Sequence, residues 1–228
     1  MKPIKRIFFN GGCIWGFVEY LGCLAYFREN KHLFAKGYHV YGVSAGSVIG
    51  LLLLLDVCPY KVLQFMKDYN YTLTVNLTQI QRDFYKFIIA DHKDAYKIAN
   101  KRLHVGVTTI NGFEFHHGNW TSNDDMAHSL IGGASIPFFN AFTDRKLLDG
   151  GLSFEETCLP KRTFVVRCRL AHFPLSAVPP SNIVCDCLFG HGYVSTRNSI
   201  RNSTINHTIK EVAFVRKPPD WIVRLFFL

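Results

Sequence analysis

Residues 42–46 read Gly-Val-Ser-Ala-Gly, and these residue types can present a serine oxygen as a nucleophile. Small residues at Gly42 and Gly46 let the backbone bend sharply from a strand into a helix, which exposes a serine at the apex. Strand-forming residues precede the segment and an apolar, helix-forming run follows it. The N-terminus of that helix would favour negative charge developing beside Ser44. The segment therefore predicts a nucleophilic serine; the alternative is an ordinary serine in a strand–helix turn.

A glycine-rich turn lies upstream, with Gly11, Gly12, Cys13 and Gly16 following the predicted strand Ile4–Phe9. Glycines allow positive φ and a close approach of the backbone to other groups. The backbone N–H groups of such a turn can hold an oxyanion. A phosphate-binding loop is excluded because no Lys-Ser/Thr pair follows, and the glycine spacing fits the dinucleotide-binding motif badly.

A third candidate group is the carboxylate of Asp149, which follows a short apolar stretch and precedes Gly150 and Gly151. A carboxylate in this position can act as a general base, with the glycines giving access to it. Taken alone, such a segment is also a common turn. Residues 134–139 lie ahead of it and read Ala-Ser-Ile-Pro-Phe-Phe, an apolar turn constrained by a proline.

Alternating strands and helices must position these groups. The predicted strands are 4–9, 38–42, 146–148 and 163–168, with a hairpin over 103–116 that turns at Asn-Gly. The predicted helices are 16–29, 47–57, 59–69, 81–101 and 124–131, and a terminal strand and helix are expected within 205–227. This order is typical of a layered α/β domain, in which ligands bind at the carboxyl ends of the strands. Because the glycine turn and the serine turn both follow strands, we expect them at one edge of the sheet.

Taken together and in this order, the four motifs resemble the patatin-like phospholipase family over roughly residues 4–155. The resemblance implies a single domain over 1–228, with a three-layer α/β/α fold and a mostly parallel central sheet. It implies a lipid acyl hydrolase with a Ser–Asp dyad, in which Ser44 attacks an ester carbonyl and Asp149 accepts its proton and later activates water. The oxyanion donors that it implies are the backbone N–H groups of Gly11, Gly12 and Cys13. Phospholipids or neutral lipids are the implied substrates, with no metal or other cofactor.

The chain departs from the family pattern at three positions. Cys13 stands where the pattern has glycine, and at positive φ a cysteine would cost about 1–2 kcal/mol. Trp15 stands where many members carry a basic residue, which favours neutral or single-chain lipids. Asn10 replaces an aspartate, and we expect its side chain to hold the turn by a hydrogen bond.

Two other interpretations stay open. An α/β-hydrolase with a Ser–His–Asp triad would use Ser44, Asp149 and either His172 or His191. Against this, the serine turn follows only the second strand, whereas that fold normally builds more strands first. A non-catalytic lipid-binding protein on the same fold is the second alternative.

The charge of the chain is uneven. The net charge is +9, and residues 160–228 carry ten basic and three acidic side chains. With 48% hydrophobic residues, a disordered chain is excluded. The basic part 156–228 ends on an apolar segment with Trp221 and Phe226, so we expect it to bind an anionic membrane surface. Its basic residues match no nucleic-acid motif, so we expect no nucleic-acid partner. Without a signal peptide or an apolar run of about 20 residues, we expect a cytoplasmic protein, peripheral on membranes or lipid droplets.

Overall fold

The computed structural model of the chain describes residues 2–69, 77–109, 111–135, 147–168, 179–206 and 211–212. The strands are β1 (Ile4–Phe9), β2 (Phe34–Val43), β3 (Leu103–Thr109), β4 (Gly112–His117), β5 (Leu148–Asp149), β6 (Phe164–Val166) and β7 (Glu211–Val212). The α-helices are α1 (Cys13–Glu29), α2 (Ala45–Leu54), α3 (Pro59–Asp68), α4 (Leu77–Ala90), α5 (Ala95–Ala99), α6 (Asn123–Gly132) and α7 (Asn182–Asn206). Short 3-10 helices are η1 (Lys31–Leu33), η2 (Gly150–Leu152) and η3 (Glu156–Cys158).

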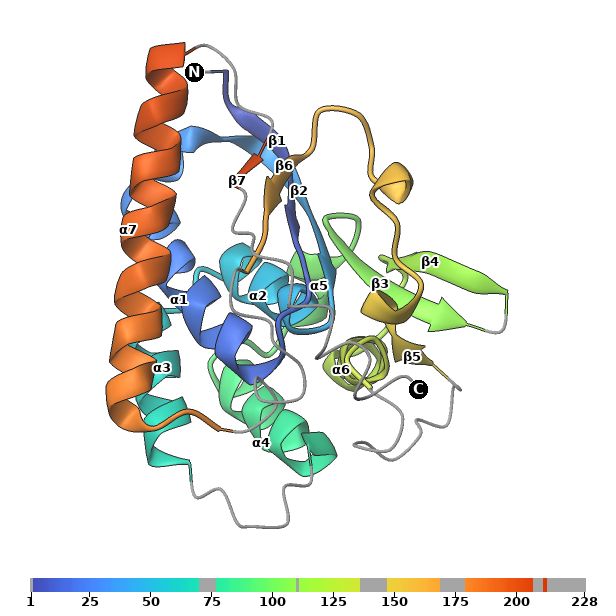
Figure 1. The fold of residues 1–228 in the computed structure, drawn as a ribbon. Coiled ribbons are helices and arrows are strands. Elements are labelled where there is room, and N and C mark those ends of the chain that lie inside the picture. The colour runs from blue at the N-terminus through green and yellow to red at the C-terminus, as the bar shows by residue number, and fades with distance from the viewer. Residues whose placement is uncertain are drawn as a thin grey trace, which may run out of the picture.

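The strands form one sheet in the order β4-β3-β2-β1-β6-β7, and β5 pairs with β3 beside this path. The neighbours from β3 through β7 run parallel, whereas β4 and β5 are antiparallel to β3. Helices flank the sheet, and α7 runs along α1 on one side of it (Figure 1). These features confirm the predicted fold class, a mixed α/β domain with a mostly parallel central sheet, consistent with a three-layer α/β/α fold.

Alternate side chains of the central strands pack into two hydrophobic cores, one on each face of the sheet. In β1, Ile7 and Phe9 belong to the large cluster that α1, α2 and α7 cover. Phe8 belongs instead to a smaller cluster on the opposite face, where Phe154 stacks on it with ring centroids 4.8 Å apart. Burial on both faces explains why β1 reads as a nearly continuous apolar run in the sequence.

Helix α7 packs against α1 through glycines. A Cβ added to Gly192 would lie 1.9 Å from the Glu19 carbonyl oxygen, and one added to Gly22 would lie 2.0 Å from the Phe189 carbonyl oxygen. The two backbones therefore touch, and any larger residue at either glycine would push the helices apart.

Replacing Gly192 with alanine should lower the free energy of unfolding by about 1–3 kcal/mol, because the added methyl overpacks this contact. The matched control is Gly190→Ala on the same helix, where an added Cβ would meet nothing within 4 Å. That change should raise the free energy of unfolding by about 0.5–1 kcal/mol, since glycine is a poor helix former. Urea denaturation of both variants measures the difference; equal midpoints would contradict the close α1–α7 contact.

Most predicted elements are present, but several predictions were incomplete or wrong. The predicted helix over 81–101 is wrong, because the chain breaks it into α4 and α5. The Asn123 side chain donates hydrogen bonds to the carbonyls of His92 and Lys93 and accepts one from the Tyr96 N–H. These bonds satisfy the backbone in the gap, so the break is stable.

Helix α7 was not predicted at all. Its buried side mixes Leu188, Phe189 and Ile200 with the small or polar residues Gly192 and Thr196, and Ile183 and Val194 are exposed, so apolar residues do not mark one face of the helix clearly. The predicted strand 146–148 is displaced to β5, and the predicted strand 163–168 is shortened to β6. Of the expected terminal elements in 205–227, β7 is present and the remainder lies outside the described residues. Among the helices of the described segments, none combines the length and the apolar character needed to cross a bilayer.

Candidate active site

Ser44 occupies the single residue between β2 and α2, at φ 53° and ψ −133°. A Cβ on Gly42 would lie 2.5 Å from the Gly46 carbonyl, and one on Gly46 would lie 2.2 Å from the Phe9 carbonyl oxygen. The Ser47 hydroxyl donates to the Gly42 carbonyl at 2.7 Å, which fastens the first turn of α2 to the end of β2. Both glycines are therefore required by contact, as the Gly-x-Ser-x-Gly spacing predicts. Positive φ at a serine stores strain of the kind found at functional sites.

Strand β3 brings Asp149 beside the serine turn. Its residue Gly106 pairs with Val43, the last residue of β2, and the next residue, Val107, pairs with Asp149 in β5. Strand β5 thus ends, at Asp149, next to the point where β2 stops, and this brings Asp149 close to Ser44, the residue after β2. A Cβ on Gly150 would lie 2.3 Å from the Gly106 carbonyl oxygen, so this approach also needs glycine.

The backbone of Asp149 is fixed on both sides. Its N–H donates to the Ser135 carbonyl at 2.8 Å, and its carbonyl accepts from the Thr108 hydroxyl at 2.8 Å. Sequence reasoning did not identify Gly106 or Thr108. A glycine inside a strand is a signal for close backbone approach and could have indicated Gly106. Ser135 belongs to the predicted proline turn, whose residues 136–139 lie outside the described segments.

The environment of Asp149 suits a base. Its side chain is only 5% exposed and that of Ser44 only 7%. Burial raises the pKa of the Asp149 carboxyl, while a hydrogen bond from the Ser44 side chain and one from the Gly151 N–H partly oppose this rise. The Gly151 bond, to Asp149 Oδ1, is 2.7 Å long. A serine beside a buried carboxylate of raised pKa is the arrangement of a nucleophile with its general base.

The glycine turn lies against Ser44. Because β1 and β2 are parallel neighbours, with Phe9 opposite Gly42, the turns that follow them meet at one edge, as predicted. A Cβ on Gly11 would lie 3.3 Å from the Ser44 Cβ, so the backbone of the turn passes directly over the serine.

The N–H groups of this turn are not equivalent. The Gly11 N–H donates to Asn10 Oδ1 at 2.8 Å, which confirms that Asn10 holds the turn. Donation from Gly11 to an oxyanion would first require this bond to break. The Gly12 N–H has no hydrogen-bond partner within the described part of the chain. Of the predicted donors, Gly12 is thus the one whose N–H no described acceptor occupies.

Cys13 adopts φ 49°, the left-handed conformation in which we expected a cysteine at this position to be strained. Replacing Cys13 with glycine should therefore raise the free energy of unfolding by about 0.5–1 kcal/mol. The relief of left-handed strain, about 1–2 kcal/mol, exceeds the entropy that glycine adds to the unfolded chain. Cys13→Ala is the control, because it removes the thiol and keeps the strain. Chemical denaturation compares the two, and a glycine variant no more stable than the alanine variant would contradict the assigned strain.

His191, one of the two histidines proposed for a triad, contacts groups other than Ser44 and Asp149. His191 Nδ1 lies 2.6 Å from Glu19 Oε1, and its Nε2 lies 3.3 Å from Ser195 Oγ. Both ring nitrogens therefore face groups on α1 and α7. His172 lies outside the described residues. The triad interpretation consequently has no support from His191.

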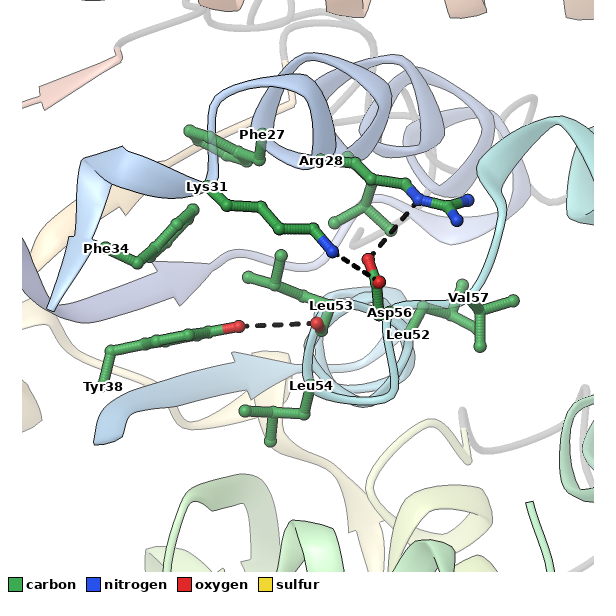
Figure 2. Close-up of a pocket in the computed structure, with 11 residues that line it drawn as sticks. Phe27, Arg28, Lys31, Phe34, Tyr38, Leu52, Leu53, Leu54, Asp56 and Val57 are labelled. Carbon is green, nitrogen blue, oxygen red and sulfur yellow. Dashed lines mark hydrogen bonds and ion pairs between the residues drawn. The ribbon is translucent and has the colours of Figure 1, made fainter. Parts of the chain in front are cut away.

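A surface pocket of about 160 Å³ lies at the other end of β2, between the C-terminal ends of α1 and α2 (Figure 2). Leucine and phenylalanine side chains line it. Arg28 and Lys31 both pair with the Asp56 carboxylate, at 3.4 Å and 2.5 Å. The Tyr38 hydroxyl donates to the Leu53 carbonyl on its wall. Since Phe34, the first residue of β2, lines the pocket and Ser44 follows the end of that strand, this pocket is separate from the serine site.

The fold and this geometry define a class: an α/β domain whose serine elbow, buried aspartate and glycine turn converge at one sheet edge. Protein-family models give no match to the chain, and neither do curated proteins. Among solved structures, VipD from Legionella pneumophila aligns with 98% of this chain at 12% sequence identity and a TM-score of 0.39. The chain spans 59% of the length of that protein.

Proposed function

We propose that the protein is a lipid acyl hydrolase that cleaves carboxylic esters through Ser44 and Asp149. The observation that carries the proposal is the buried Ser44–Asp149 pair on a strained strand–helix elbow. Within the described residues no cation pairs with Asp149; a buried carboxylate without such a partner is costly, and such groups concentrate at functional sites. The resemblance of four ordered motifs to the patatin-like phospholipases supports an acyl ester as the substrate class.

In the first half-reaction, Ser44 Oγ attacks the ester carbonyl carbon and gives its proton to Asp149. The oxyanion accepts hydrogen bonds from backbone N–H groups of the glycine turn, with Gly12 and Cys13 as the proposed donors. When the C–O bond to the alcohol breaks, Asp149 returns that proton to the leaving oxygen. The product is a released alcohol and an acyl group on Ser44.

In the second half-reaction, Asp149 takes a proton from water, and the hydroxide oxygen attacks the acyl carbon. The bond to Ser44 Oγ then breaks, and Oγ recovers the proton from Asp149. A free carboxylic acid leaves, and the resting pair is restored. No step requires a metal or another cofactor.

The chemistry around the site favours an apolar acyl substrate. Leu152 follows the Asp149 turn and is 54% exposed, although it is a large apolar side chain. Trp15 lies in the first turn of α1, beside the proposed oxyanion donors. We therefore propose phospholipids or neutral lipids as substrates, with a preference for neutral or single-chain lipids because Trp15 replaces a basic residue.

Product analysis on phospholipid, lysolipid and triacylglycerol tests this function. Wild-type protein should release free fatty acid from at least one of the three, and Ser44→Ala should release none. If folded wild-type protein releases no fatty acid and still binds lipid, the non-catalytic lipid-binding interpretation replaces the hydrolase.

We also propose that the basic C-terminal part attaches the protein to an anionic membrane surface. Lys161, Arg162 and Arg201 are exposed basic side chains of this part. Sedimentation with phosphatidylserine-rich vesicles should recover more protein than sedimentation with phosphatidylcholine vesicles. Raising the salt concentration should reduce this excess, because salt screens exposed charges. Equal binding to both vesicles at low salt would remove the electrostatic part of this proposal.

A further inference from the structure

A buried carboxylate lies behind the glycine turn, in a cluster that the dyad does not include. Glu19, on α1, is 0% exposed. Its Oε2 accepts a hydrogen bond from the Cys168 thiol at 2.7 Å, and its Oε1 lies 2.6 Å from His191 Nδ1. A buried carboxylate is tolerated only when its oxygens are hydrogen-bonded or paired. Both oxygens of Glu19 meet that condition, so the carboxylate joins the segment after β6 to α7 across α1.

Cys168 forms the back wall of the glycine turn. A Cβ on Gly12 would lie 3.2 Å from the Cys168 Cβ, and one on Gly16 would lie 3.1 Å from the Cys168 sulfur. The Cys168 N–H donates to the Tyr20 hydroxyl at 2.8 Å, so its backbone is held by α1 as well. The turn thus rests on a side chain whose thiol is fixed by Glu19.

The other side of Glu19 is fixed by α7. Gly192 lets α7 approach the Glu19 backbone, and His191, the residue before it, reaches the carboxylate. The result is a continuous chain of contacts from α7 through His191, Glu19 and Cys168 to Gly12.

We propose that Glu19 is a positioning residue that holds the backbone of the glycine turn through Cys168. The inference rests on the proposed function, because the turn is the proposed oxyanion site. An oxyanion donor must be fixed before the reaction to stabilise the transition state. Glu19 does not touch the substrate; it restricts the movement of the N–H groups that do.

Replacing Glu19 with glutamine keeps the shape of the side chain and removes one of its two acceptor oxygens, since an amide nitrogen accepts no hydrogen bond. We expect kcat for ester hydrolysis to fall about tenfold to a hundredfold with little change in KM, because the loss affects the transition state. Cys168→Ala should lower kcat by a similar factor. The double variant should be no worse than either single variant, because both changes break the same chain of contacts.

The matched control is Glu29→Gln on the same helix. Glu29 Oε2 accepts from the Tyr193 hydroxyl at 2.6 Å, so it also links α1 to α7 but lies at the far end from the turn. This variant should retain kcat within about twofold. Equal losses of kcat in the Glu19 and Glu29 variants would show a purely structural role and overturn the proposal. Full activity of both Glu19→Gln and Cys168→Ala, or losses that multiply independently in the double variant, would overturn it too.

Hydrogen exchange gives a readout that does not need activity. Peptides covering residues 10–16 should exchange faster in Glu19→Gln and in Cys168→Ala than in wild type, and at the wild-type rate in Glu29→Gln. If the wild type hydrolyses nothing, the proposed function fails while this comparison still decides the role of Glu19. Unchanged exchange over 10–16 in both variants overturns the inference whatever the activity. If Glu19→Gln does not fold, Cys168→Ala alone carries both measurements.

Discussion

Replacing Ser44 with alanine should lower kcat for ester hydrolysis by at least about ten-thousandfold. Alanine keeps the size of the residue and the bend of the elbow but removes the oxygen that forms the acyl intermediate. The elbow is held by Gly42, Gly46 and the Ser47 hydroxyl rather than by the Ser44 side chain, so the fold should persist. Initial rates on a chromogenic short-chain ester, with circular dichroism to verify folding, give the comparison.

The neighbouring serine supplies the control for this change. Ser47→Ala removes a buried hydrogen bond to the Gly42 carbonyl and should cost about 1–2 kcal/mol of stability. It should leave a nucleophile in place and therefore retain far more activity than Ser44→Ala. If Ser44→Ala retained wild-type activity, another residue would perform the attack and the proposed mechanism would be wrong.

Replacing Asp149 with asparagine should lower kcat about a thousandfold or more, because the amide cannot accept the Ser44 proton in either half-reaction. Asparagine still offers an oxygen to the Gly151 N–H, so the local turn should be maintained. This effect is measured by comparing kcat for ester hydrolysis in Asp149→Asn and in the control variant Asp94→Asn. Asp94 is an exposed acid whose partner is Lys97, and its replacement should have no effect on kcat. Comparable losses in the two variants would contradict a specific role for Asp149.

The pH dependence follows from the same carboxyl. Burial raises its pKa above the usual value of 3.8, and the base must be ionised to accept a proton. The wild-type kcat/KM should therefore fall as the pH is lowered through this raised pKa, and the acid limb should lie above the usual aspartate range.

The contribution of Asp149 to the free energy of unfolding should change with pH in the opposite direction to kcat/KM. The folded protein binds the Asp149 proton more tightly than the unfolded chain, so its contribution to stability declines as the pH rises from the usual pKa to the raised one. At neutral pH the buried negative charge is destabilising, and Asp149→Asn should raise the urea midpoint. Below the usual aspartate pKa this gain should vanish. A gain that is independent of pH would contradict the assigned burial of charge.

The parts of the fold that could be predicted are those with strong local signals. Strand β1 is a buried apolar run with a glycine turn, and the hairpin β3–β4 turns at Asn111-Gly112. Each is determined by residues within a few positions of one another. The break between α4 and α5 depends on Asn123, some 30 residues away, and α7 depends on a glycine contact with α1. Neither the break between α4 and α5 nor helix α7 is therefore indicated by the residues next to it in the sequence.

The candidate site likewise has features that follow from local sequence signals and features that depend on distant contacts. The strain at Ser44 and Cys13 could be anticipated, because it follows from turns with few permitted residues. The proximity of Asp149 to Ser44 depends on the register of β3, which pairs Gly106 with Val43 and Val107 with Asp149. Cys168 and His191 reach Glu19 across 149 and 172 residues. Such contacts arise only when the sheet and α7 have assembled.

Covalent labelling with a fluorophosphonate tests the central claim most directly. The probe phosphonylates an activated serine, and the peptide that carries the label identifies the residue. We predict one labelled peptide containing Ser44, no label in Ser44→Ala, and much slower labelling in Asp149→Asn. Absence of label on folded wild-type protein, or a label that persists in Ser44→Ala, would contradict the account.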